Sequence, residues 1–168
     1  MTEWNFCPQC AKPLIPIRGQ VGDIHPTCPD GHYIHYDNPK PVAGAVIQHG
    51  DKYLVLQRNI EPSKGQWELC GGFINVGETA RQAVRREIKE ELGVEGTIIR
   101  YIGSFTSEYG DTGITVTGTG FLVELGSPDI RPDPQEVMDY RWVDRDGFPP
   151  MAHQDDQGVV NTFLAQTA

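Results

Sequence analysis

The acidic segment Gly71–Val94, which reads GGFINVGETARQAVRREIKEELGV, constrains the fold more than any other part of the chain. Thr79 and Gln82 have the spacing of a capping box, and Gly93 stands where a helix ends. The segment therefore predicts a helix from about Thr79 to Leu92. The apolar stripe with which this helix can pack on a sheet consists of Val84, Ile88 and Leu92.

The same predicted helix carries a group of carboxylates. Residues three and four apart share a helix face, so we expect Glu87 to lie beside both Glu90 and Glu91. Three converging negative charges repel one another unless a cation lies among them. Mg²⁺ suits such a site because it takes oxygen ligands and keeps waters that a phosphate can replace. The alternative is an exposed helix in which Arg86 pairs with Glu90 and no metal binds.

The residues in front of the helix favour the metal site. Gly71 and Gly72 are expected just before a loop, where a bare backbone lets a carbonyl or an amide approach a metal or a phosphate. Glu78 precedes the helix cap and can reach back across the site.

These residues resemble the Nudix box, G-x5-E-x7-R-E-U-x-E-E-x-G-U, in which U is aliphatic. Gly72, Glu78 and the segment 86–94 match it at every defined position. The resemblance extends with less force over about residues 40–165. One departure is Cys70, where many members carry proline; we interpret Cys70 as a packed thiol, because no basic partner that would activate it is evident.

The resemblance implies Mg²⁺- or Mn²⁺-dependent hydrolysis of a nucleoside diphosphate linked to another group, which gives two phosphate monoesters. The roles that it implies are Glu87, Glu90, Glu91 and the Gly72 carbonyl as metal ligands, and Arg86 and Glu78 as residues that orient the acids. Either Glu90 or Glu91 is the general base, or the base comes from a later loop, where the candidate is Glu136. An exposed loop acid without a role is the alternative for Glu136.

The remaining pattern predicts an α/β (α+β) fold, a mixed β-sheet sandwiched between helices, because strands and helices interleave with short connections. The expected elements are hairpins formed by residues 42–48 with 53–58 and 98–105 with 113–125, short strands at 67–72 and 140–144, and a closing helix at 157–166.

Residues 1–39 are predicted to form a separate zinc ribbon in front of a Nudix hydrolase domain at 40–168. Cys7 and Cys10 form a Cys-x2-Cys knuckle, and Cys28 and His32 follow at a spacing that suits tetrahedral Zn²⁺. Zinc would supply the folding energy that this core-poor segment lacks. Zinc-ribbon members of the family usually have cysteine at position 31, where this chain has glycine. The candidates for the fourth ligand are therefore His32, our first choice, His25 and His35, and the metal-free alternative treats the cysteines as small apolar residues.

Composition limits the partners. The formal net charge is -9, from 23 acidic and 14 basic residues, which disfavours nonspecific binding to nucleic acid or to an anionic membrane. No stretch resembles a transmembrane helix or a secretory signal, so we expect a cytoplasmic protein. The family resemblance adds the expectation of a homodimer and of a small nucleotide substrate.

The substrate is narrowed only by resemblance. The S-Q-P-W-P-F-P run of members that prefer NADH is missing, which leaves ADP-ribose and FAD as the favoured substrates. The proline marker of ADP-ribose enzymes is missing too, since Gly110 stands in that neighbourhood. An NADH or capped-RNA pyrophosphatase and a nucleotide-binding regulator without turnover are the alternatives. Phe105, Tyr109 and Phe121 are candidates for stacking on a base, although strand aromatics more often belong to a core.

Overall fold

The computed structural model describes residues 4–19 and 22–166. By internal contacts the chain divides into two compact units, Met1–Asn38 and Pro39–Ala168. This division lies one residue before the predicted boundary between residues 39 and 40. Each unit is described by itself.

The first unit has almost no apolar interior. Strands β1 (Ile15–Arg18) and β2 (Ile24–Thr27) form an antiparallel pair. Among the described residues of this unit, the buried hydrophobic side chains are those of Cys7 and Cys28. Two strands without a core are marginal in water, so we expect this unit to need a link between its cysteines, such as the predicted zinc ion.

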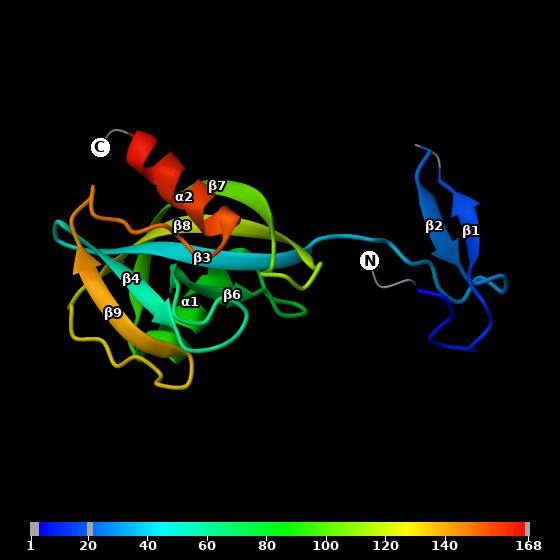
Figure 1. The fold of residues 1–168 in the computed structure, drawn as a ribbon, viewed down its shortest axis with the longest axis horizontal. Helices are drawn as coiled ribbons and strands as arrows, with labels where there is room; N and C mark the ends of the chain where they lie inside the picture. Colours follow the sequence, from blue (N-terminus) through cyan, green and yellow to red (C-terminus); the bar gives the residue numbers. More distant parts are fainter. Residues whose placement is uncertain (1–3, 20–21, 167–168) are drawn as a thin grey trace. The chain divides into compact units, whose positions relative to one another are not determined.

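The second unit is built on one seven-stranded mixed sheet, as predicted (Figure 1). Its strands are β3 (Lys40–His49), β4 (Lys52–Arg58), β5 (Trp67–Glu68), β6 (Cys70–Phe73), β7 (Gly96–Glu108), β8 (Thr115–Leu125) and β9 (Val137–Val143). The order is β5-β4-β3-β8-β7, with β6 paired to β3 and β9 paired to β4. Strands β3 and β8 are parallel, and the other pairs are antiparallel. Both predicted hairpins, β3–β4 and β7–β8, are confirmed.

The strand predicted at residues 67–72 is divided in two. Glu68 pairs with Leu56 of β4, whereas Cys70 pairs with Ala45 of β3, so the chain moves from one neighbour to the next at Leu69. The Leu69 N–H donates to Asp156 Oδ2 (3.2 Å). A continuous strand cannot pair with both neighbours in this way, which is why the single predicted strand is wrong here.

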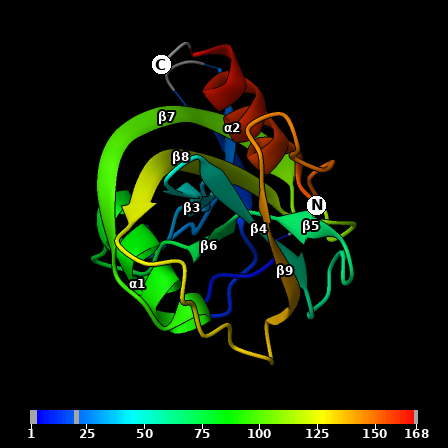
Figure 2. The same ribbon diagram turned by 90° about the vertical axis from the view of Figure 1, so that its left-hand side faces the viewer.

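Helices α1 (Ala80–Leu92) and α2 (Gln154–Ala165) cover opposite faces of the sheet (Figure 2). Strand alternation supplies both cores, because Ala45 and Ile47 pack in the cluster with α1 while Val46 packs in the cluster with α2. Neither of these helices, within the part of the chain that the structure describes, is long and apolar enough to cross a membrane.

The ends of α1 follow the predicted signals. Thr79 is the N-cap, and its side chain accepts from the Gln82 N–H while the Gln82 side chain accepts from the Thr79 N–H. At the other end Gly93 adopts the left-handed conformation (φ 67°), and its N–H donates to the Lys89 carbonyl. The helix that carries the acids is therefore capped at both ends by local sequence.

We expect Thr79→Ala to lower the free energy of unfolding by about 1 kcal/mol, because the Gln82 N–H loses its side-chain acceptor. Urea unfolding measures the change. Thr79→Ser keeps the hydroxyl and is the matched control, so equal stability of the two variants would contradict a capping role.

Candidate active site

A cavity of about 360 Å³ opens in the second unit beside α1. The predicted site residues that line it are Gly72, Arg86, Glu87, Glu90, Glu91 and Glu136. Glu136 is exposed in the loop before β9, and its negative charge contributes to the raised pKa values of Glu68 and Glu87. The structure thus brings the loop candidate to the same cavity as the helix acids.

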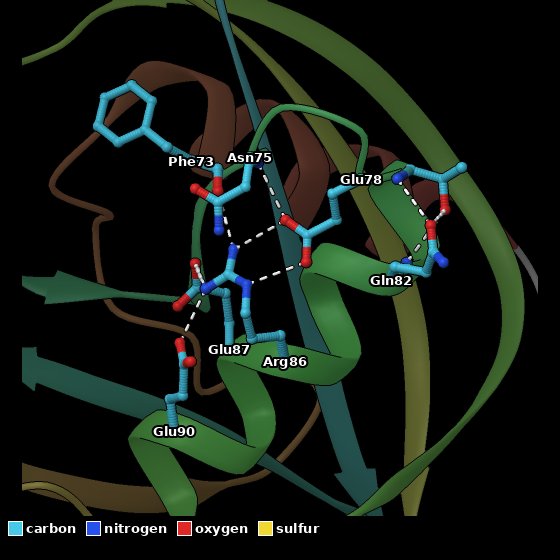
Figure 3. A network of polar contacts seen from close by, with 8 residues as sticks. Phe73, Asn75, Glu78, Gln82, Arg86, Glu87 and Glu90 are labelled. Atoms are coloured by element: carbon cyan, nitrogen blue, oxygen red, sulfur yellow. Dashed lines mark hydrogen bonds and ion pairs between the residues drawn. The ribbon is translucent and has the colours of Figure 1, made fainter.

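Arg86 connects the acids of α1 to the segment in front of the helix (Figure 3). Its Nε donates to Glu78 Oε1 (2.9 Å), and its Nη1 donates to both Glu87 Oε1 and Glu90 Oε2 (2.8 Å each). Its Nη2 donates to the Phe73 carbonyl (2.9 Å). These bonds raise the pKa of Arg86 still further, with the bond to Glu78 as the largest cause, so the residue remains a cation. The orienting role predicted for Arg86 and Glu78 has the contacts that it requires.

Two of the three acids are buried rather than solvated. Glu87 is 8% exposed and Glu91 is 6% exposed. Burial raises the pKa of Glu87 against the opposing effect of Arg86, and burial together with the charges of Glu68 and Glu87 raises the pKa of Glu91. The exposed-helix alternative correctly gives the Arg86–Glu90 ion pair, but it does not account for these two buried carboxylates.

The acids are less convergent than predicted. Among the described residues, the groups of three or more ligand atoms within 4.8 Å of one another do not include the set Glu87, Glu90 and Glu91. The reason is that Arg86 Nη1 lies between Glu87 and Glu90, while Glu91 Oε1 accepts from the Gly71 N–H (3.2 Å).

The donor set nevertheless fits Mg²⁺ or Mn²⁺. Carboxylate oxygens are the preferred ligands of such cations, and Arg86 brings one positive charge between Glu87 and Glu90. The raised pKa values of Glu87 and Glu91 show that ionising both is unfavourable in the structure, a cost that a bound divalent cation would offset.

Gly72 lies near the end of β6, one residue before Phe73 and the loop that leads to α1, as predicted. It pairs with Ala43 of β3, and a Cβ at Gly72 would overlap the carboxylate of Glu87. The neighbouring Gly71 has the same constraint against the backbone of Ala43. The glycines therefore serve close approach, as predicted, but what approaches them is α1 on one side and β3 on the other.

A second set of ionisable residues lines the cavity, and it was not predicted from the sequence: Arg58, Glu68, His153, Asp155 and Asp156. Arg58 and Glu68 form a buried ion pair. Burial raises the pKa of Glu68 to about 7 in spite of Arg58, and burial beside Asp155 raises the pKa of Asp156 to about 8. Charged residues inside the apolar runs LVLQR and WELC were the available signal for the first pair.

The three aromatic candidates for stacking on a base lie in different parts of the second unit. Tyr109 lines the cavity, whereas Phe121 is buried in the core under α1 and Phe105 packs against the core under α2. Cys70 is buried, and burial together with Glu91 raises the pKa of its thiol, so it is a protonated packing residue.

In the first unit, the ligand atoms of Cys7, Cys10, Cys28 and His32 all lie within 4.8 Å of one another. The Sγ atoms of Cys10 and Cys28 are 3.6 Å apart, close to the roughly 3.8 Å expected for two thiolates on tetrahedral zinc. His25 instead pairs with Asp23, and His35 stacks on Trp4. This geometry selects His32 among the three candidate histidines.

A family model of the NUDIX domain matches residues 38–163. The chain belongs to the NUDIX family. Its relatives include proteins described as "NAD-capped RNA hydrolase NudC". The protein of that name from Vibrio vulnificus is 30% identical over 148 residues, which are 88% of this chain and 54% of the relative. The one from Stutzerimonas stutzeri is 28% identical over 168 residues, 99% of this chain and 58% of the relative. The chain thus spans about half the length of these relatives.

Solved structures agree with this NUDIX assignment. A NUDIX hydrolase from Nitrosomonas europaea superposes with a TM-score of 0.74 at 25% identity, over 95% of this chain and 88% of that protein. A MutT NUDIX hydrolase from Burkholderia pseudomallei superposes with a TM-score of 0.67 at 25% identity, over 74% of this chain and 98% of that protein.

We expect Gly72→Ala to weaken Mn²⁺ binding at the acids of α1, because the new Cβ displaces the Glu87 carboxylate. Electron paramagnetic resonance of free Mn²⁺ measures the affinity. The matched control is Gly126→Ala, since a Cβ at Gly126 meets nothing within 4 Å. Unchanged Mn²⁺ affinity in a folded Gly72→Ala protein would argue against Glu87 as a ligand.

We expect protein purified without chelator to carry one zinc per chain. Cys28→Ser and His32→Ala should lose it, because each removes one of four clustered ligands. Elemental analysis gives the stoichiometry, and His35→Ala is the control that should retain zinc. Loss of zinc from His35→Ala but not from His32→Ala would reverse the ligand assignment.

Proposed function

We propose that this NUDIX hydrolase cleaves the pyrophosphate bond of a nucleoside diphosphate linked to another group, with Mg²⁺ or Mn²⁺, and releases two phosphate monoesters. The observation that carries the proposal is the pair of buried carboxylates Glu87 and Glu91 on α1, which line a cavity that opens to solvent together with Arg86. Buried acids with raised pKa values at a cavity are typical of functional sites rather than of a solvated helix.

Glu87, Glu90 and Glu91 are the proposed metal ligands, with the Gly72 carbonyl as a further one. A divalent cation bound there supplies charge neutralisation for the phosphates and a lowered pKa for a bound water. Arg86 holds Glu87 and Glu90 in place while it is itself held by Glu78. The family resemblance and the fit of the donor set support these roles.

The general base is proposed among three carboxylates. Glu91 is the most buried of them and accepts from the Gly71 N–H, which favours a ligand role. The side chain of Glu90 is 59% exposed, and Glu136 is exposed at the cavity, so either of these can receive a proton from water.

The substrate proposed first is a soluble dinucleotide of the ADP-ribose or FAD type. A second candidate is a substrate of the NAD type, either free NADH or the NAD cap of an RNA, and the relatives described as NAD-capped RNA hydrolases favour the capped RNA. The net charge of -9 opposes a long RNA contact but not contact with a short capped end. A regulator that binds without turnover is disfavoured by the complete set of acids.

The test is an assay with saturating Mg²⁺ over ADP-ribose, NADH, NAD, FAD, NAD-capped RNA, diadenosine polyphosphates and nucleoside triphosphates, with products identified. We expect two phosphate monoesters from at least one dinucleotide. Cleavage of nucleoside triphosphates alone would replace the proposed substrate class, and no cleavage at all would overturn the enzymatic proposal.

With the best substrate, we expect Glu90→Gln and Glu91→Gln each to lower kcat on the order of 100-fold or more while the protein stays folded. The reason is loss of a charged ligand or of the base. Glu95→Gln is the control, because Glu95 lies just beyond α1 with an 83% exposed side chain. Near-normal kcat in both variants would exclude α1 as the metal-binding element.

A further inference from the structure

One part of the cavity lining has no role in the proposed hydrolysis. His153 lines the cavity directly before α2 and is 9% exposed. Its Nε2 is buried without a hydrogen-bond partner, and among the described residues no other buried side-chain nitrogen or oxygen is in that state. Such groups are rare in folded proteins, so this atom calls for a partner that enters the cavity.

The orientation of the His153 ring is fixed by its neighbours. Tyr109 stacks on it with ring centroids 5.4 Å apart and an interplanar angle of 21°. Phe73 in turn meets Tyr109 edge-on at 5.4 Å. The Tyr109 hydroxyl accepts from Arg58 Nη2 at 3.5 Å, and Arg58 is bound to Glu68. The imidazole is therefore held in one orientation by Tyr109, which follows β7, and through it by Arg58 at the end of β4.

His153 has no side-chain role in starting α2. It occupies the N-cap position, but its side chain makes no capping hydrogen bond. A substitution at His153 therefore removes no cap, and its consequences for ligands can be separated from its consequences for the helix.

The charge of the surroundings indicates what kind of group Nε2 meets. Burial and Arg58 lower the pKa of His153, so the ring is neutral at pH 7 and carries one donor and one acceptor. Asp155 Oδ1 accepts from the Ser107 hydroxyl (2.7 Å), and Asp156 Oδ2 accepts from the Leu69 N–H. Both aspartates line the cavity in the first turn of α2, where they take the place of any external anion.

A phosphate is therefore poorly suited to this region, because Asp155 and Asp156 already occupy the first turn of α2 and Arg58 is already paired with Glu68. An uncharged group that exchanges hydrogen bonds with carboxyl groups and also pairs with a neutral imidazole is well suited. Ribose hydroxyls and the hydrogen-bonding edge of a heterocyclic base share this chemistry.

We propose that His153 is a specificity-determining residue whose Nε2 hydrogen-bonds an uncharged hydroxyl or heterocycle-edge group in the organic part of the substrate. The inference rests on the proposed function for the identity of that substrate, but the binding step itself needs no turnover. In this proposal the nucleoside or sugar portion of the substrate contacts the part of the cavity lined by His153, Tyr109, Asp155 and Asp156. The acids of α1, which line the same cavity, are proposed to bind the metal instead.

The first experiment measures binding of AMP and of ribose 5-phosphate by calorimetry, with saturating Mg²⁺, to the wild type, His153→Phe and His153→Gln. Phenylalanine keeps the stacking on Tyr109 but removes the ring nitrogens, whereas glutamine restores an amide donor and acceptor. We expect His153→Phe to weaken one of the two ligands about tenfold and His153→Gln to recover most of that loss. Thermal unfolding of all three proteins checks that the fold is intact.

Analogues then identify the group that Nε2 contacts. The probes are 2′-deoxy-AMP, 3′-deoxy-AMP and purine riboside 5′-monophosphate for AMP, and 2-deoxyribose 5-phosphate for ribose 5-phosphate. The analogue that lacks the contacted group should bind the wild type about tenfold more weakly than its parent, with no further loss in His153→Phe. A purely structural role of His153 would instead weaken every probe by the same factor.

Kinetics with the dinucleotide that the wild type cleaves best should show KM raised about tenfold by His153→Phe, with kcat within about twofold of the wild type. Three outcomes would each overturn the proposal. The wild type and His153→Phe could bind both probes equally, every analogue could show a loss that adds to that of His153→Phe, or the wild type could bind neither probe measurably. If the wild type binds AMP through His153 but cleaves no dinucleotide, the proposed function fails while the assignment of His153 stands.

Discussion

The hydrogen bonds of the Arg86 guanidinium are the interactions on which the site depends. It bonds at once to Glu78, Glu87, Glu90 and the Phe73 carbonyl, and so it ties α1 to the end of β6 and to the turn before the helix. A helix face that buries two carboxylates would otherwise be unfavourable next to an apolar stripe. Arg86 compensates the buried carboxylate of Glu87, and the Gly71 N–H donates to that of Glu91. A lysine would supply the charge without the planar set of donors that reaches four partners.

This arrangement also requires glycine at the two central positions of β6. A Cβ at Gly71 would overlap the backbone of β3, and one at Gly72 would overlap Glu87, so this part of β6 is confined between β3 and α1. The close approach brings the Gly71 N–H to Glu91 and the Phe73 carbonyl to Arg86. The glycine pair and the acidic helix are therefore one structural unit, which explains why they occur at fixed spacing in the sequence.

Local signals in the sequence predicted what local interactions determine. The capping box at Thr79, the stop at Gly93 and the two hairpins need only neighbouring residues, and they appear as expected. The break at Leu69 was missed, because it follows from a change of pairing partner from β4 to β3, and residues 67–72 carry no local signal of where that change falls. The same holds for Arg58, Glu68 and His153: each reads as an isolated polar residue in sequence, and only the assembled sheet and α2 place them around one cavity.

The division between predicted and missed residues has a chemical meaning. The residues that match the family pattern lie in the segment 72–94, which holds the end of β6 and all of α1, and the bond to be broken is proposed to bind there. The residues that the pattern does not contain lie on β4 and β5, just after β7 and just before α2, and they supply the stacked Tyr109–His153 pair and the buried Arg58–Glu68 pair. Because the two sets come from different elements, the second can change without disturbing the first. On the proposal made for His153, members of one family can therefore differ in substrate, and the groups around His153 are a more direct guide to the substrate of this chain than the names of its relatives.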